Sequence, residues 1–252
     1  MKFLTTFLLT FLLITSTVCA FAKHNTAIKD TTETVDPGLS GFDRIKIAGP
    51  FDVHLVQGAA ESVKLEVPAD VKGRITAKMS GSTLKIHNAH DNWSQGYKSW
   101  YSDKSVWHHH KKIVVYITVK DLKGITISGS GDVIFTDGIN ANKLKLRVRG
   151  SGNALGKIEV KTIKSHISGS GSIKLSCSAE NSTVRIFGSG NFIARDLATL
   201  SCAAHISGSG KAEVNASDKV NAAVYGSGRV SYTGAAKTIK KTKSGSGEIT
   251  MF

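Results

Sequence analysis

The residues best suited to binding chemistry lie in a polar, aromatic segment that interrupts an otherwise regular pattern. This segment, the insertion at 87–112, holds all three tryptophans of the chain, Trp93, Trp100 and Trp107. Aromatic faces suit sugar rings, and an exposed tryptophan is costly to keep without a partner. The insertion is therefore a candidate glycan-binding loop. The alternative is that its rings pack as a hydrophobic lid over the neighbouring structure.

The same insertion is rich in histidine, a ligand for Zn, Ni and Cu. Its weak metal-ligand candidates are His87, His90, His108 and His110. Three adjacent histidines cannot all face one ion, so their spacing does not define a site. We expect a solvated basic loop here, with no metal and no other cofactor.

A second candidate site consists of basic residues that recur about every 19 residues in the second half of the chain. They are Arg147, His166, Arg185 and His205, called the basic row below. If successive copies stack, the row contains no acidic residue, and its like charges repel. An anionic ligand would relieve that repulsion. The alternative is a solvated basic face that keeps the protein soluble.

Catalytic residues are harder to find. Polysaccharide lyases and hydrolases built on β-helices need paired carboxylates or a calcium-bridged acidic cluster. The residues three after the first glycine of each repeat include no neighbouring acidic pair: Asp132, Asn153, Ser172, Asn191, Lys211, Arg229 and Glu248. We predict a protein that is not an enzyme, and a polysaccharide-active β-helix enzyme is the alternative.

An internal repeat must position these side chains. Gly-Ser-Gly triplets begin at Gly129, Gly150, Gly169, Gly188, Gly208, Gly226 and Gly245. Residues two before and four after the first glycine are apolar in nearly every copy, which is typical of strands with one buried face. A unit of about 19 residues cannot bury that face alone, so the units must stack. The sequence predicts an all-β fold, a β-solenoid of about ten rungs.

The N-terminus predicts export. A short basic start, an apolar run from Phe3 to Ile14 and the segment Ala20-Phe21-Ala22 form the three regions of a signal peptide over residues 1–22. We expect a periplasmic, outer-membrane-associated or extracellular protein, and lipidation of Cys19 is the alternative. Residues 23–40 are predicted to be a flexible leader, and 41–252 the solenoid domain.

Cleavage after Ala22 would leave two cysteines, Cys177 and Cys202, in an oxidising compartment. Both stand at inward positions of the repeat but on different walls of adjacent rungs. We expect buried free thiols rather than a disulfide, although a bridge stays open.

The charge balance indicates anionic partners. The chain has 33 Lys and Arg against 19 Asp and Glu, a formal net charge of +14. An anionic glycan or cell-surface polymer fits this balance and an exported protein, whereas nucleic acid does not fit the compartment. A membrane surface and a second copy of the chain remain open as partners.

The repeated corners also resemble a known family. The segment Ser128-Gly129-Ser130-Gly131-Asp132-Val133 and the tripeptide Gly138-Ile139-Asn140 resemble the bacterial family described as putative auto-transporter adhesin, head GIN domain. The stretch from Phe51 to Gly58 is similar to that family's early strand. The resemblance covers roughly residues 42 to 252. It implies a β-solenoid fold and a cell-envelope setting, and it supplies no catalytic residues.

Overall fold

The structure is a computed structural model, and it describes residues 32–69, 72–89 and 113–252. The predicted signal peptide and most of the insertion lie outside the described residues. Apart from a short 3-10 helix, η1 (Lys72–Arg74), every regular element described is a strand, and the strands form a single 16-stranded sheet. None of the described residues forms a helix long and apolar enough to cross a bilayer.

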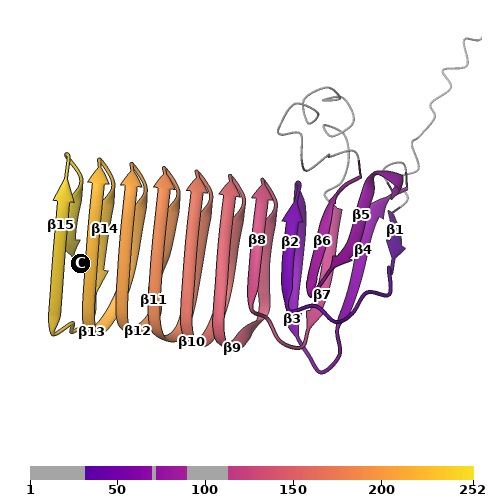
Figure 1. Ribbon diagram of the computed structural model, residues 1–252, viewed down its shortest axis with the longest axis horizontal. Coiled ribbons are helices and arrows are strands. Elements are labelled where there is room, and N and C mark those ends of the chain that lie inside the picture. The colour runs from indigo at the N-terminus through magenta and orange to yellow at the C-terminus, as the bar shows by residue number, and fades with distance from the viewer. Residues whose placement is uncertain (1–31, 70–71, 90–112) are drawn as a thin grey trace, which may run out of the picture. The chain divides into compact units, whose positions relative to one another are not determined.

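Five long parallel strands form the body of the solenoid (Figure 1). They are β9 (Asp132–Gly150), β10 (Asn153–Gly169), β11 (Ser172–Gly188), β12 (Asn191–Gly208) and β13 (Lys211–Gly226). Each begins just after one Gly-Ser-Gly corner, bends along its length and ends at the next corner. The first glycines of successive corners are register partners. The predicted β-solenoid is confirmed, with about seven turns.

Alternation along each strand fills the interior. The residues two before each corner are 0–1% exposed from the first to the sixth triplet: Ile127, Val148, Ile167, Ile186, Ile206 and Val224. The residues four after the first glycine of each triplet are also 0–1% exposed, from Val133 in the first triplet to Val230 in the sixth. These two rows confirm the inward positions expected from the repeat. Stacking at about 4.8 Å per rung places similar apolar side chains directly above one another.

The corners depend on the absence of side chains. The first glycine of each triplet has positive φ, +119° at Gly226 for example. From the second triplet to the sixth, the following serine donates its N–H to the carbonyl of the glycine one rung back, as Ser209 does to Gly188 at 3.0 Å. The second glycine lies against the neighbouring rung. A Cβ at Gly210 would stand 2.7 Å from both the Gly190 carbonyl oxygen and the Ile186 Cγ2. Any larger residue there would push two rungs apart.

The Gly210→Ala substitution should therefore lower the free energy of unfolding by about 1–3 kcal/mol, the usual cost of overpacking. Ser209→Ala is the matched control, because the Ser209 side chain is exposed and the backbone N–H is retained. The control should change stability by about 0.5 kcal/mol or less. Urea denaturation of both variants measures the difference, and equal midpoints would contradict this account of the corner.

The N-terminal layers are not stacked in chain order. β2 (Arg44–Ala48) and β3 (Phe51–Gln57) pair with β8 (Gly124–Gly129) and with the start of β9, although the intervening residues number more than sixty. On their other side they pair with β6 (Thr83–Asn88) and β7 (Ile113–Val119). Figure 1 shows indigo β2 between β8 and β6. Thus β2 and β3 form one layer, and β6 and β7 form the layer outside it. The chain then crosses back and continues the solenoid at β8.

Polar contacts hold the crossing. The Gln57 side chain donates to the carbonyls of Lys120 and Asn140 at 3.0 and 3.1 Å and accepts the Asn140 N–H at 2.8 Å. The Lys123 Nζ lies 2.8 Å from the Asp43 carboxylate and lowers the pKa of that carboxyl. These contacts join the start and the end of the segment that contains β2 and β3 to the residues at which the chain returns to the solenoid.

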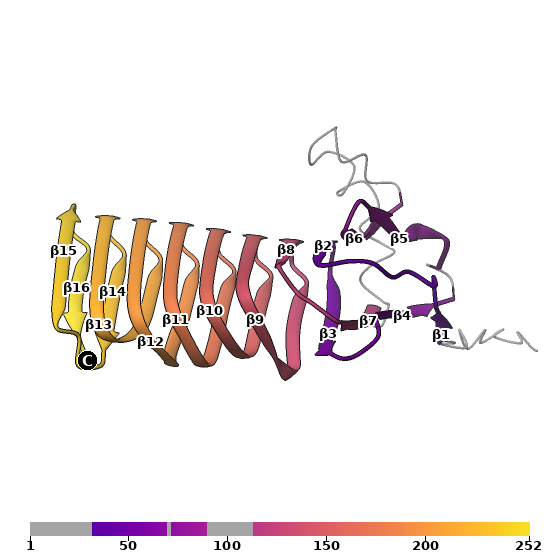
Figure 2. The same cartoon turned by 60° about the horizontal axis from the view of Figure 1, so that its bottom comes forward.

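Three further strands cover the N-terminal end (Figure 2). β4 (Ser62–Pro68) pairs antiparallel with β7, β5 (Ile75–Ser80) pairs antiparallel with β6, and β1 (Thr32–Val35) pairs antiparallel with β4. A flexible leader over all of 23–40 is therefore wrong for 32–35, because an edge of β4 was available for pairing. The expected ten rungs are too many, because β4, β5, β6 and β7 form this covering and one outer layer instead of successive turns.

The C-terminal end has charged side chains where other turns are apolar. β14 (Arg229–Thr233), β15 (Thr238–Ser244) and β16 (Glu248–Met251) form the last layers, and every residue of β15 is exposed. Lys241 and Lys243 occupy positions that are apolar in earlier repeats, as the sequence indicates. Lysine on an open edge discourages the addition of another strand.

The two cysteines differ in environment. Both thiols are free, Cys202 is buried and Cys177 is exposed. The expected burial of Cys177 is wrong. Its φ of +87° reverses the alternation at a register shift of β11, whereas its row partners Ile158 and Leu197 point inward. Burial raises the pKa of the Cys202 thiol to about 12.

A thiol-specific reagent should accordingly modify the native protein at Cys177 and leave Cys202 unmodified until unfolding, because the reactive species is the thiolate. Mass spectrometry after brief labelling of the native and of the urea-unfolded chain measures this. Rapid labelling of Cys202 in the native protein would contradict its place in the core.

Candidate functional site

The basic row is a continuous line of neighbours on one outer wall of the solenoid. Arg147 pairs with His166, His166 with Arg185, and Arg185 with His205, each on the next rung. Alternation along each strand points their side chains away from the apolar rows, because the residues on both sides of each are buried. The structure therefore brings together all four residues selected from the repeat.

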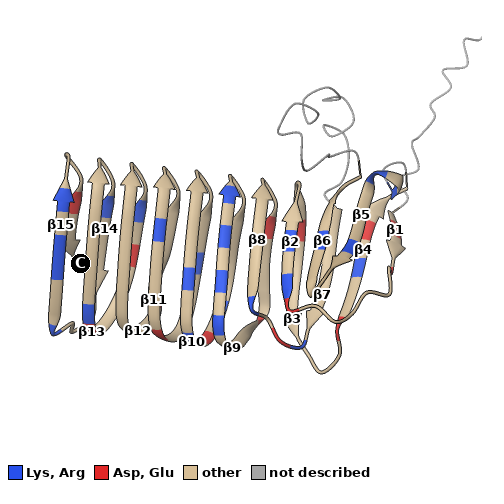
Figure 3. Ribbon diagram, viewed as in Figure 1, with Lys and Arg blue, Asp and Glu red and all other residues tan. Residues whose placement is uncertain are grey.

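This wall carries little opposite charge. Lys145 and Lys164 are register partners beside the row, and Arg149 follows Arg147 by two residues. Figure 3 shows a series of basic segments along β9. Within the described part of the chain, no carboxylate forms an ion pair with Arg147, Arg149 or Arg185. We call this surface the basic wall; it consists of the basic row together with Lys145, Arg149 and Lys164. The basic wall can therefore offer several cationic groups, spaced by single rungs, to one extended anion.

Aromatic rings accompany the basic row. The ring centroids of His166 and Phe187 lie 5.3 Å apart, those of Phe187 and His205 6.4 Å, and those of His205 and Tyr225 5.1 Å. Phe187 and Tyr225 are 42% and 43% exposed. We call these four residues the ring series. Sequence reasoning missed Phe187 and Tyr225, although both stand immediately before the first glycine of a triplet.

The pKa of His166 reflects its burial and the positive charge around it on this wall. Burial lowers its pKa, and the positive charges of Arg147, Arg149, Arg185 and Lys145 lower it further. The imidazole is therefore disfavoured as a cation in the folded protein. An anion on the wall would reduce the effect by which these four cations oppose protonation of His166.

The lowered pKa gives a stability prediction with a defined sign. The unfolded chain binds a proton at His166 near the ordinary pKa of about 6.5, whereas the folded protein resists it until lower pH. Stability should therefore fall as pH drops below about 6.5. His166→Gln should reduce that fall. Urea denaturation of both proteins at about pH 7.5 and about pH 5.5 tests this, and identical pH dependence would refute it.

The insertion takes the place of a corner. Its flanking strands β6 and β7 pair with β2 and β3 on either side of Gly49 and Pro50. The insertion thus connects two walls of the outer layer where other turns use a tight tripeptide. Trp93, Trp100 and Trp107 lie outside the described residues, so their role as a binding loop stays a prediction.

Of the four metal-ligand candidates, His87 lies within the described residues and the other three lie outside them. His87 belongs to β6, and its Nδ1 lies 2.8 Å from the Asn88 carbonyl oxygen, which can only accept. His90, His108 and His110 lie outside the described residues. Among the residues that are described, no group of three or more His, Cys, Asp or Glu could hold a metal ion.

The layer order also creates a carboxylate pair that the repeat alone does not reveal. Asp52 of β3 is the register partner of Asp132 in β9, and the Asn153 amide donates to Asp132 at 2.8 Å. The row of residues three after the first glycine holds no neighbouring acidic pair, but Asp132 has an acidic neighbour from outside that row. The pair escaped detection because residues 80 positions apart in the chain become adjacent only through the inserted layer.

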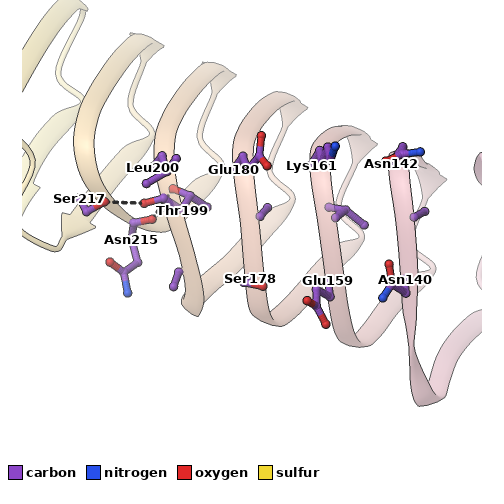
Figure 4. Close-up of a pocket in the computed structure, with 14 residues that line it drawn as sticks. Asn140, Asn142, Glu159, Lys161, Ser178, Glu180, Thr199, Leu200, Asn215 and Ser217 are labelled. Atoms are coloured by element: carbon purple, nitrogen blue, oxygen red, sulfur yellow. Dashed lines mark hydrogen bonds between the residues drawn. The ribbon is translucent and has the colours of Figure 1, made fainter.

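A groove of about 500 Å³ runs across successive turns on another part of the solenoid (Figure 4). Small or apolar register partners line its middle: Ala141, Val160, Ala179 and Thr199. Glu159, Lys161 and Glu180 line its sides, so the charge there is mixed. This mixed lining distinguishes the groove from the basic wall and gives it no preference for a polyanion.

These features define the class of protein as a glycine-cornered β-solenoid with ordered rows of outward side chains. Residues 41–236 match the family described as putative auto-transporter adhesin, head GIN domain, and the chain belongs to that family. The resemblance seen in the corner segments is thereby confirmed. The family is described by adhesion, which is in keeping with a surface or exported protein, and not by a catalytic activity. No curated protein matches the chain.

Solved structures share the fold. A putative adhesin from Bacteroides fragilis has a TM-score of 0.71 and 22% identity, over 88% of this chain and 97% of that chain. A putative lipid binding protein from Parabacteroides distasonis has a TM-score of 0.68 and 22% identity, over 89% and 98%. A putative adhesin from Parabacteroides merdae has a TM-score of 0.64 and 20% identity, over 88% and 95%. At these identities the likeness establishes the fold.

Proposed function

We propose that this chain is a non-enzymatic, exported envelope or surface protein that binds polyanionic polymers on its basic wall. The observation that carries the proposal is the unbroken register of Arg147, His166, Arg185 and His205. A linear polyanion can contact several of these groups at once, whereas a small anion can contact only one or two. Adhesion through a cell-surface polymer is the role that accords with the family description.

The proposal predicts binding that is sensitive to salt and to two arginines. Affinity of the full chain for hyaluronan and for inorganic polyphosphate should fall steeply between about 50 and about 500 mM salt, because exposed charges are screened over about 10 Å or less. Arg147→Gln with Arg185→Gln should weaken both by about tenfold or more. Isothermal titration calorimetry provides the measurement.

The matched control is Lys157→Gln with Lys174→Gln, which removes the same charge from exposed positions outside the basic row. If the control weakens binding as much as the arginine pair does, general charge and not the row is responsible. Binding that resists salt and is lost in Trp100→Ala would instead place the site in the insertion.

Two other outcomes are informative. One structural neighbour is named a lipid binding protein, so vesicles containing anionic lipid are a useful competitor. Displacement of polymer by anionic but not zwitterionic vesicles would identify a membrane surface as the partner.

The pair Asp52 and Asp132 favours a polysaccharide-cleaving enzyme as the second candidate function. New reducing ends that disappear in Asp132→Asn would establish that alternative.

A further inference from the structure

The outward residues of the basic wall alternate with a period of two rungs. Along the basic row, arginine alternates with histidine from Arg147 to His205. The row two residues further along each strand also alternates, with a large residue on every second rung. Its register partners are, in order, Arg149, Ser168, Phe187, Ser207, Tyr225 and Ser244.

This period sets a length along the solenoid axis. Two rungs measure about 9.6 Å, twice the spacing of hydrogen-bonded strands. Guanidinium groups and exposed ring faces therefore each recur at about this interval. Extended polysaccharide chains repeat their disaccharide over much the same length, with sugar faces available for stacking and, in many acidic polymers, one carboxylate in each disaccharide.

We infer that the ligand of the basic wall is an acidic polysaccharide with one carboxylate per disaccharide, bound along the solenoid axis at two rungs per disaccharide. This inference rests on the proposed function and specifies its ligand. Arg147 and Arg185 meet successive carboxylates. Phe187, on the same rung as Arg185, and Tyr225, two rungs farther on, present ring faces to the sugars. Four rungs separate Arg147 from Tyr225, about 19 Å, which corresponds to a tetrasaccharide.

Charge and exposure favour a saccharide over other polyanions. The wall has no acidic residue in either row, which suits any polyanion. Phe187 and Tyr225 remain more than two-fifths exposed, although their ring centroids lie 5.3 and 5.1 Å from those of His166 and His205, at tilted angles. Polyphosphate has no apolar face to place on them, whereas a sugar ring has one.

The test compares two probes on the same variants of the full chain. Phe187→Leu with Tyr225→Leu keeps apolar bulk and removes both ring faces. This variant should bind hyaluronan hexasaccharide about tenfold more weakly, while its affinity for inorganic polyphosphate stays within about twofold. Tyr116→Leu is the matched control, because Tyr116 is 42% exposed on another wall and stacks on His54. The control should leave both affinities unchanged.

Ligand length provides a second measurement. Hyaluronan tetrasaccharide should bind nearly as tightly as the hexasaccharide, and the disaccharide much more weakly, because it reaches only one arginine. If the leucine variant binds both probes as the native chain does, the saccharide inference is overturned and the proposed polyanion function stands. If the arginine pair is also without effect on either probe, both the inference and the proposed function fail.

Discussion

Every other feature of this protein depends on the close backbone approach at the Gly-Ser-Gly corners. The second glycine of each triplet packs against a carbonyl one rung back, and from the second triplet to the sixth the serine N–H donates across the same gap. These contacts fix the register between successive turns at the corner. Residues close to the corner therefore lie beside their counterparts in the neighbouring turn, as Ile167 lies beside Ile186, whereas register shifts such as the one between Lys174 and Cys177 occur farther along the strands. The corner thereby converts a sequence period into ordered rows of side chains.

A stacked structure must still terminate, and its two ends do so differently. The N-terminal end is covered by the antiparallel strands β4, β5 and β1, so its apolar interior has neighbours on the outer side. The C-terminal end places cations on rings instead. The Lys241 ammonium lies 4.9 Å from the Tyr232 ring and the Arg195 guanidinium 3.8 Å from the Phe252 ring. These contacts shield aromatic surface while leaving a charged edge that disfavours further stacking.

Features that follow from the period could be predicted from the sequence, and features that break it could not. The fold, the inward rows and the line from Arg147 to His205 all follow from aligning the triplets. The outward thiol of Cys177 depends on a single left-handed residue, which alternation cannot foresee. The register pairing of Asp52 with Asp132 depends on a layer inserted out of chain order. Phe187 did carry a signal in its fixed distance from a corner, but its ring contacts depend on neighbouring rungs.

The same stacking that stabilises the interior makes the basic wall unfavourable by itself. An apolar side chain repeated at each rung gains contacts from its neighbours, whereas a cation repeated at each rung acquires repulsion. The alternation of arginine with histidine moderates this cost, because His166 gives up its proton more readily than an isolated imidazole does. A polyanion would reverse the balance, since it neutralises the arginines and favours the protonated imidazole. Binding on this wall should therefore be coupled to proton uptake at His166. Because the ligand relieves the repulsion between the cations of the free protein, that relief contributes to the affinity for the ligand.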